Sequence, residues 1–93
     1  MKLRKLVLDG KKIKSEEDMH KFIANCLEFP DYYGMNLDAL WDMLTAWVEY
    51  PLIIEWKNFD ASEIFLGQEN ALKILKLFQE AEQEIDGLTV KSR

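Results

Sequence analysis

Three short apolar runs, separated by stretches of helical periodicity, restrict the possible folds of this chain more than any other feature. They occupy residues 3–8, 52–54 and 88–90, and the turn signal Asp9-Gly10 ends the first run. The second run is apolar at consecutive positions, which is typical of a parallel strand covered on both faces. Parallel strands joined by helices form right-handed crossovers. The pattern therefore predicts one α/β domain over residues 1–93, with the order β-α-α-β-α-α-β and a small three-stranded parallel sheet among about four helices.

The first helix is expected between Ser15 and Pro30. Ser15 and the three acidic residues after it resemble a capping box, and Pro30 disfavours helical geometry at the residue before it. Apolar residues repeat at helical spacing on one expected buried face, formed by Met19, Phe22, Ile23, Cys26 and Leu27. On this pattern Cys26 is a small core residue rather than a nucleophile. His20 lies off the apolar face and is expected to be solvated, not a metal ligand.

Three more segments complete the predicted order. Residues 37–46 form the second expected helix, with Asn36 as N-cap and Gly34 suited to a positive φ in the loop before it. Residues 56–65 are expected to be a loop with a short helical turn. A long amphipathic helix is predicted over residues 68–84, and Gly87 ends it. Its expected inward side chains are Ala71, Leu72, Leu75, Phe78, Ala81 and Ile85.

Charge is distributed very unevenly along the chain, whose net charge is −5. The first 14 residues carry six Lys or Arg, including Lys2, against the single acid Asp9. No Lys or Arg occurs from Phe22 to Trp56, a stretch with six acidic residues, all three Trp and all three Tyr. An acidic surface repels nucleic acids and attracts basic proteins, and Tyr and Trp are enriched at protein interfaces. The composition thus predicts a protein partner rather than a nucleic acid.

Two aspartates on the second predicted helix stand out. Asp38 and Asp42 are one turn apart and therefore neighbours, and like charges at this spacing destabilise a helix. Asp38 is favoured by the helix dipole in the first turn, but Asp42 has no such compensation and no basic residue within four positions. Trp41 lies at the edge of the same face, and Tyr32 and Tyr33 precede the helix. An unfavourable placement of like charges on a helix, with no nearby residue to offset it, often marks a functional site.

This aspartate-bearing face has four possible interpretations. A general acid/base pair normally flanks a deep cleft and comes from different elements, which two turns of convex helix do not provide. A hard cation needs six or more oxygens from a folded loop; no such loop is evident, so no metal or other cofactor is expected. The remaining two are a solvated helix face and a recognition surface for a cationic site on another protein. We favour the last, so the chain is not expected to be an enzyme.

Residues 30–42, Pro-Asp-Tyr-Tyr-Gly-Met-Asn-Leu-Asp-Ala-Leu-Trp-Asp, closely resemble the signature of the barstar family, intracellular inhibitors of barnase-type ribonucleases. The resemblance continues through residues 44–52, Glu55-Trp56 and residues 78–81, and so covers nearly the whole chain. It implies three parallel strands with four helices, in agreement with the pattern above. It also suggests a cis bond at Tyr50-Pro51, which the sequence alone allows but does not show.

The resemblance also implies roles for individual residues. Asp42 matches the family's aspartate that enters the nuclease site where the RNA phosphate would bind, and Asp38 matches one that pairs with a further nuclease arginine. Tyr32 matches a tyrosine that packs on the catalytic histidine. Trp41 and Trp47 match contact tryptophans, Gly34 and Asn36 match a loop that closes over the site, and Glu80 matches an outlying edge residue. The expected partner-binding residues are Tyr32, Tyr33, Gly34, Asn36, Asp38, Trp41, Asp42, Trp47 and Glu80.

Some positions depart from the family pattern. Met35 stands where the best-known member has a glutamate, Ala46 replaces a glycine, and the segment from Phe59 to Gln68 is one residue longer than expected. The register of Glu80 is therefore open, and an ion pair with Lys76 is its alternative role. The alternative function is a similar binding module for a different basic protein.

Cellular location and assembly are also expectations at this point. The single cysteine and the absence of a long apolar leader or membrane span favour a cytoplasmic protein. We expect a monomer when free, although exposed Trp41 and Trp47 would favour weak self-association, and a 1:1 complex with a basic microbial ribonuclease.

Overall fold

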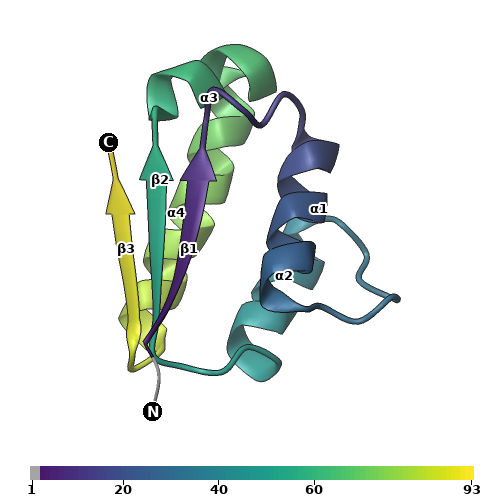
Figure 1. The fold of residues 1–93 in the computed structure, drawn as a ribbon, viewed down its shortest axis with the longest axis vertical. Helices are drawn as coiled ribbons and strands as arrows, with labels where there is room; N and C mark the ends of the chain where they lie inside the picture. The colour runs from purple at the N-terminus through teal and green to yellow at the C-terminus, as the bar shows by residue number, and fades with distance from the viewer. Residues whose placement is uncertain (1–2) are drawn as a thin grey trace.

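The computed structural model describes residues 3–93, so Lys2 of the basic N-terminal segment lies outside the described residues. Three parallel strands form one sheet in the order β1-β2-β3, and the chain follows the predicted β-α-α-β-α-α-β order (Figure 1). The elements are β1 (Arg4–Asp9), α1 (Glu16–Leu27), α2 (Leu37–Ala46), β2 (Leu52–Lys57), α3 (Phe59–Leu66), α4 (Gln68–Glu84) and β3 (Leu88–Ser92). The predicted α/β fold class is confirmed. Among residues 3–93 no helix is both long and apolar enough for a membrane span.

The sheet is covered by helices on one face only, which corrects the expectation of a strand covered on both faces. Side chains of a strand alternate between the two faces, and along β2 Leu52, Ile54 and Trp56 are fully buried. Ile53, between them, is only partly buried, and Lys57 is exposed. The helices lie to one side of the sheet in Figure 1. The sequence did not reveal this alternation, because the partly buried Ile53 is as apolar as the buried Leu52 and Ile54 on either side of it.

Glu55 points to the open face of the sheet but is only 5% exposed, because two basic side chains cover it. Lys5 Nζ lies 2.9 Å from Glu55 Oε1, and the Arg93 guanidinium pairs with Oε2. The hydrogen bonds from Lys5 and Arg93 lower the pKa of Glu55 to about 2. Glu55 is therefore neutralised locally and does not belong to the acidic surface that the sequence indicated.

Trp56 is the centre of the core rather than the start of a loop. It pairs with Leu8 and Ser92 in the sheet, and its ring makes edge contacts with Phe59 and Phe78 at centroid distances of 4.8 and 6.0 Å. Its indole Nε1 donates a hydrogen bond to Ser62 Oγ at 2.8 Å. The expected loop and short turn over residues 56–65 is thus wrong. The strand continues to Lys57, and α3 is a full eight-residue helix.

The first helix is rotated relative to its predicted buried face. Ser15 caps it as expected, accepting a hydrogen bond from the Asp18 amide at 3.0 Å. The buried residues, however, are Met19, His20, Ile23 and Leu27. Phe22 is 39% exposed and Cys26 is exposed, so the expectation that Cys26 is a core residue is wrong. Helical spacing alone did not distinguish a face centred on Ile23 from one shifted toward Phe22 and Cys26.

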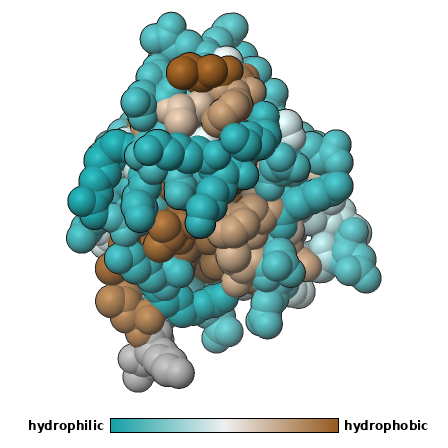
Figure 2. All heavy atoms as spheres, turned by 45° about the horizontal axis from the view of Figure 1, so that its top comes forward, coloured by the Kyte–Doolittle hydropathy of each residue, from teal (hydrophilic) through white to brown (hydrophobic). Residues whose placement is uncertain are grey.

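The long helix α4 has the predicted bounds, and its buried residues are Ala71, Ile74, Phe78 and Ala81. Leu72 is 46% exposed, which corrects its expected inward position, while Leu75 and Ile85 are half-buried. Figure 2 shows exposed apolar residues as small separate groups among hydrophilic ones on the face that it views. That face therefore presents no continuous apolar patch of the kind that marks a hydrophobic interface.

Candidate functional site

The helix α2 begins at a well-formed cap. The Asn36 side-chain oxygen accepts a hydrogen bond from the Ala39 amide at 2.8 Å, as expected for an N-cap, and its amide nitrogen donates to the Gly34 carbonyl at 3.4 Å. The left-handed residue of the loop is Met35, with φ 55°, and not Gly34. The expectation that Gly34 has a positive φ is therefore wrong. A non-glycine residue costs about 1–2 kcal/mol in this conformation, so the loop holds some strain at Met35.

The two carboxylates of α2 are exposed on the side of the helix away from the core. Leu40 and Leu44 have no exposed surface, whereas Asp38 and Asp42 are both exposed. Neither aspartate forms an ion pair within 4.0 Å in the part of the chain that the structure describes. The helix thus presents two exposed negative charges one turn apart, neither of them closed into an ion pair among residues 3–93.

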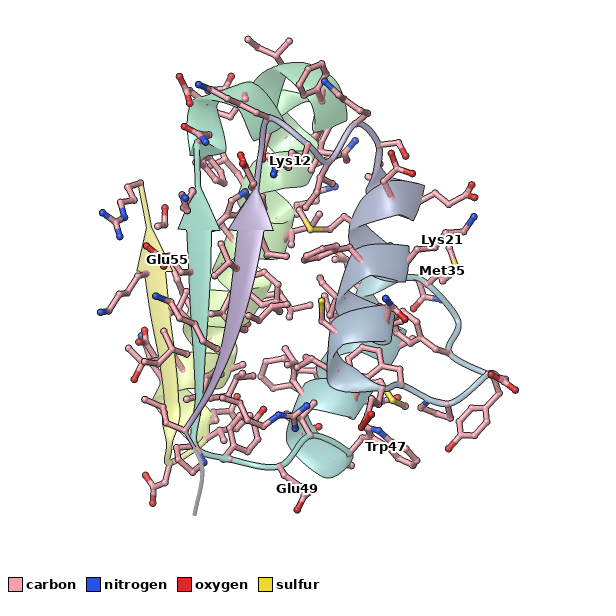
Figure 3. The ribbon with its side chains drawn as sticks, in the orientation of Figure 1. Lys12, Lys21, Met35, Trp47, Glu49 and Glu55 are labelled. Atoms are coloured by element: carbon pink, nitrogen blue, oxygen red, sulfur yellow. The ribbon has the colours of Figure 1, made fainter. Side chains whose placement is uncertain are left out.

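Aromatic side chains belong to α2, to its C-cap residue and to the loop that leads into it. Tyr32 is 75% exposed and Trp47 is 47% exposed, while Trp41 is half-buried against the core. The Trp47 indole donates a hydrogen bond to the Glu28 carbonyl at 3.2 Å, which links the end of α2 to the end of α1. Figure 3 shows Met35 and Trp47 on the side of the molecule opposite Glu55. We use the term acidic surface for Tyr32, Asp38, Trp41, Asp42 and Trp47.

Tyr33 anchors the loop that carries Tyr32. Its hydroxyl lies 2.6 Å from His20 Nδ1, and its ring makes an edge contact with Phe29 at 4.9 Å between centroids. Burial raises the pKa of Tyr33 to about 12 and lowers the pKa of His20 below its usual value. The expectation of a solvated His20 is wrong, since the side chain is 4% exposed. No local signal could reveal this contact, because the two partners are 13 residues apart.

A shallow depression adjoins the acidic surface where α2 packs against α4. It is lined by residues of both helices, namely Leu37, Asp38, Trp41, Lys73, Lys76, Leu77 and Glu80. Glu80 thus lines the same depression as Asp38 and Trp41, and its role at the edge of an interface stays a prediction. The alternative ion pair between Lys76 and Glu80 does not form within 4.0 Å in the described residues. Lys73 and Lys76 are neighbours of Asp38 that no local pattern in the sequence could reveal, because only the packing of α4 against α2 brings them there.

The structure thus brings Asp38 and Trp41 of α2 together with Glu80 of α4 in one depression, and Asn36 caps the helix that carries both aspartates. No group of three or more His, Cys, Asp or Glu side chains able to hold a metal ion occurs within residues 3–93. The acidic surface has exposed carboxylates for cations and aromatic rings for stacking, and the depression beside it is shallow. Such a surface is suited to insertion into a cationic cavity of another protein.

Comparison with known proteins gives two findings. The family described as "Barstar (barnase inhibitor)" matches residues 3–93 of the chain. A protein of Bacillus subtilis (strain 168) named "Putative ribonuclease inhibitor YrdF" is 47% identical over 83 residues, which cover 89% of this chain and 90% of that protein. Both similarities extend over the loop, α2 and α4, and so include every residue of the acidic surface.

Proposed function

Since the chain belongs to the barstar family of barnase inhibitors, we propose that it inhibits a ribonuclease by covering the active site of that enzyme. Proteins of this family act as inhibitors and not as enzymes, and the similar B. subtilis protein is named as a ribonuclease inhibitor. The proposed target is an extracellular ribonuclease of the barnase type.

The pair of uncompensated carboxylates on α2 supports the proposed mechanism most directly. A ribonuclease gathers cationic groups around the phosphate of its substrate, because negative charge develops there in the transition state. Asp42, in the middle of α2, is proposed to take the place of that phosphate, with Asp38 pairing with a neighbouring cation. Charge-assisted hydrogen bonds to carboxylates are about twice as strong as neutral ones. The rigid helix holds both groups in place before binding, so little conformational entropy is lost.

The remaining residues are proposed to frame these two carboxylates. Tyr32 and Trp47 offer exposed rings for stacking, and Trp41 contributes its half-buried ring at the edge of α2. Gly34 and Asn36 belong to the covering loop, where Asn36 also caps the helix. The two other expected contact residues are Tyr33, which holds the loop through His20, and Glu80 on α4.

The proposed complex contains one inhibitor and one nuclease, with the free inhibitor as a monomer. Opposite charges on two surfaces accelerate their encounter. Rapid capture would matter for a protein that protects the cytoplasm of the cell producing the nuclease, the location proposed for this chain.

A different basic protein is the second candidate target. Met35 is 37% exposed and Ala46 is exposed at the last position of α2. Both departures from the family pattern therefore lie at or beside the acidic surface. A partner without nuclease activity but with a cationic cavity would satisfy the same carboxylates.

The test is a titration of ribonuclease activity with the purified protein, with barnase as the first defined probe. We expect stoichiometric inhibition that Asp42→Asn weakens by about 2–5 kcal/mol, or roughly 30- to 4,000-fold, because a nuclease cation loses its partner. Asp60→Asn is the control, since Asp60 is exposed in the first turn of α3, outside the acidic surface. It removes the same charge and should leave inhibition unchanged.

Two results would contradict the proposal. One is uninhibited cleavage of RNA by every barnase-type nuclease tested at equimolar inhibitor. The other is inhibition that Asp42→Asn and Asp60→Asn leave equally strong. Capture of a basic protein without nuclease activity, lost in Asp42→Asn, would support the second candidate instead.

A further inference from the structure

Two lysines of α4 lie beside the acidic surface, in the depression between α2 and α4. Lys73 and Lys76 line the same depression as Asp38, Trp41 and Glu80, and both lysines are exposed. The depression therefore contains two positive and two negative side chains. This differs from the region around Asp42, which has no Lys or Arg within four positions in the sequence.

Neither lysine is strongly engaged inside the molecule. Lys73 Nζ lies 4.0 Å from Glu69 Oε2, and both side chains are more than half exposed; such pairs contribute little to stability. Lys76 has no acidic atom within 4.0 Å among residues 3–93. Its spacing from Glu80 places the lysine nearer the helix N-terminus, which is the less favourable order for an ion pair on a helix. Both ammonium groups are therefore available to a partner.

We propose that Lys73 and Lys76 are specificity determinants and that the partner nuclease presents a carboxylate to them, beside the cation that meets Asp38. This inference rests on the proposed function of α2. The partner would then have two distinct regions: a cluster of cations opposite Asp42, and a rim of alternating charge opposite the depression between α2 and α4.

Repulsion gives this arrangement its discriminating power. A nuclease whose rim bears only cations would place them against two lysines as well as against Asp38 and Glu80, so attraction and repulsion would nearly cancel. A rim carboxylate turns the lysine contacts into attractive ones. Specificity commonly depends on such penalties against incorrect partners as well as on contacts with the correct one. Lys73 and Lys76 would thus restrict the set of nucleases that the same two aspartates could otherwise block.

The experiment compares wild type with the Lys73→Gln, Lys76→Gln double variant against nucleases that the wild type inhibits. The probes are barnase and the ribonuclease activity retained from the culture medium of the source cells by immobilised wild-type protein. The matched control is Lys57→Gln, Lys91→Gln, which removes the same charge from the exposed side chains of β2 and β3 on the open face of the sheet. Inhibition constants are measured at about 20 mM and about 200 mM salt, because screening weakens exposed pairs.

We expect the retained nuclease to be inhibited at least about fivefold less well by the lysine variant at low salt, with a smaller difference at high salt and no loss in the control. Equal or tighter inhibition of that nuclease would overturn the inference, because the lysines would then face solvent or cations. Weaker inhibition of the retained nuclease, together with unchanged or tighter inhibition of barnase, would show directly that the lysines discriminate between partners. If wild type inhibits no nuclease, or if Asp42→Asn has no effect, the proposed function fails first and this inference fails with it.

Discussion

Replacing Tyr33 with phenylalanine removes only the hydroxyl group that lies 2.6 Å from His20 Nδ1. The ring and its edge contact with Phe29 remain. Because His20 is 4% exposed, water does not readily replace the lost partner. A buried polar atom without a partner costs about 1–3 kcal/mol. We therefore expect Tyr33→Phe to lower the free energy of unfolding by about 2 kcal/mol.

Urea denaturation followed by tryptophan fluorescence measures this change. With a slope of about 1.5 kcal/mol per M of urea, a loss of 2 kcal/mol moves the midpoint by about 1.3 M. The control is Tyr32→Phe at the neighbouring position, whose side chain is 75% exposed. Exposed substitutions of this kind usually change stability by less than about 0.5 kcal/mol.

The loop should also become more mobile in Tyr33→Phe, because the side-chain bond between Tyr33 and α1 is lost. Faster amide hydrogen exchange in residues 31–36 than in Tyr32→Phe would report this change. Equal urea midpoints for the two variants would refute the reasoning, since His20 would then satisfy its nitrogen without Tyr33.

Four further predictions concern stability. Ser62→Ala leaves the buried Trp56 indole N–H without its acceptor at 2.8 Å, so the free energy of unfolding should fall by about 1–3 kcal/mol in urea titrations; a Trp56→Phe background should remove most of the effect. Gly10→Ala should lower the thermal midpoint markedly, because an added Cβ would lie 2.1 Å from the Asn58 carbonyl oxygen, and an unchanged midpoint would refute this packing argument. Burial lowers the pKa of His20 below 6.5, so the unfolded state binds a proton more readily than the folded state. The free energy of unfolding should therefore fall as the pH drops through 6.5 towards the folded pKa. His20→Gln should make the free energy of unfolding less dependent on pH in this range. The pKa of Glu55 is lowered from 4.5 to about 2, so the free energy of unfolding should fall a second time as the pH drops from 4.5 to about 2. Glu55→Gln should not show this second fall.

The local features of the fold follow from neighbouring residues and were predictable. Ser15 and Asn36 cap their helices as expected, because a cap is made by one side chain and an amide three residues later. The bounds of α4 and the order of strands and helices also agree with the prediction, since turn residues and helical periodicity are properties of short segments. The exposed carboxylates of Asp38 and Asp42 follow in the same way from the apolar face opposite them.

Features that depend on contacts between distant segments could not be read from these patterns. His20 is buried and its Nδ1 lies beside the hydroxyl of Tyr33. The negative charge of Glu55 is balanced by the positive charges of Lys5 and Arg93, which pair with it on the open face of the sheet. Lys76 shares a depression with Asp38 only because α4 packs against α2.

By itself, then, the sequence determined the order of strands and helices, except for the extent of β2 and α3 in residues 56–65, and it determined which helix carries the exposed aspartates. Only the tertiary structure decided which face of the sheet stays open and which charges meet across it. Periodicity records the spacing of residues along one segment, whereas burial and ion pairing depend on what another segment places against it.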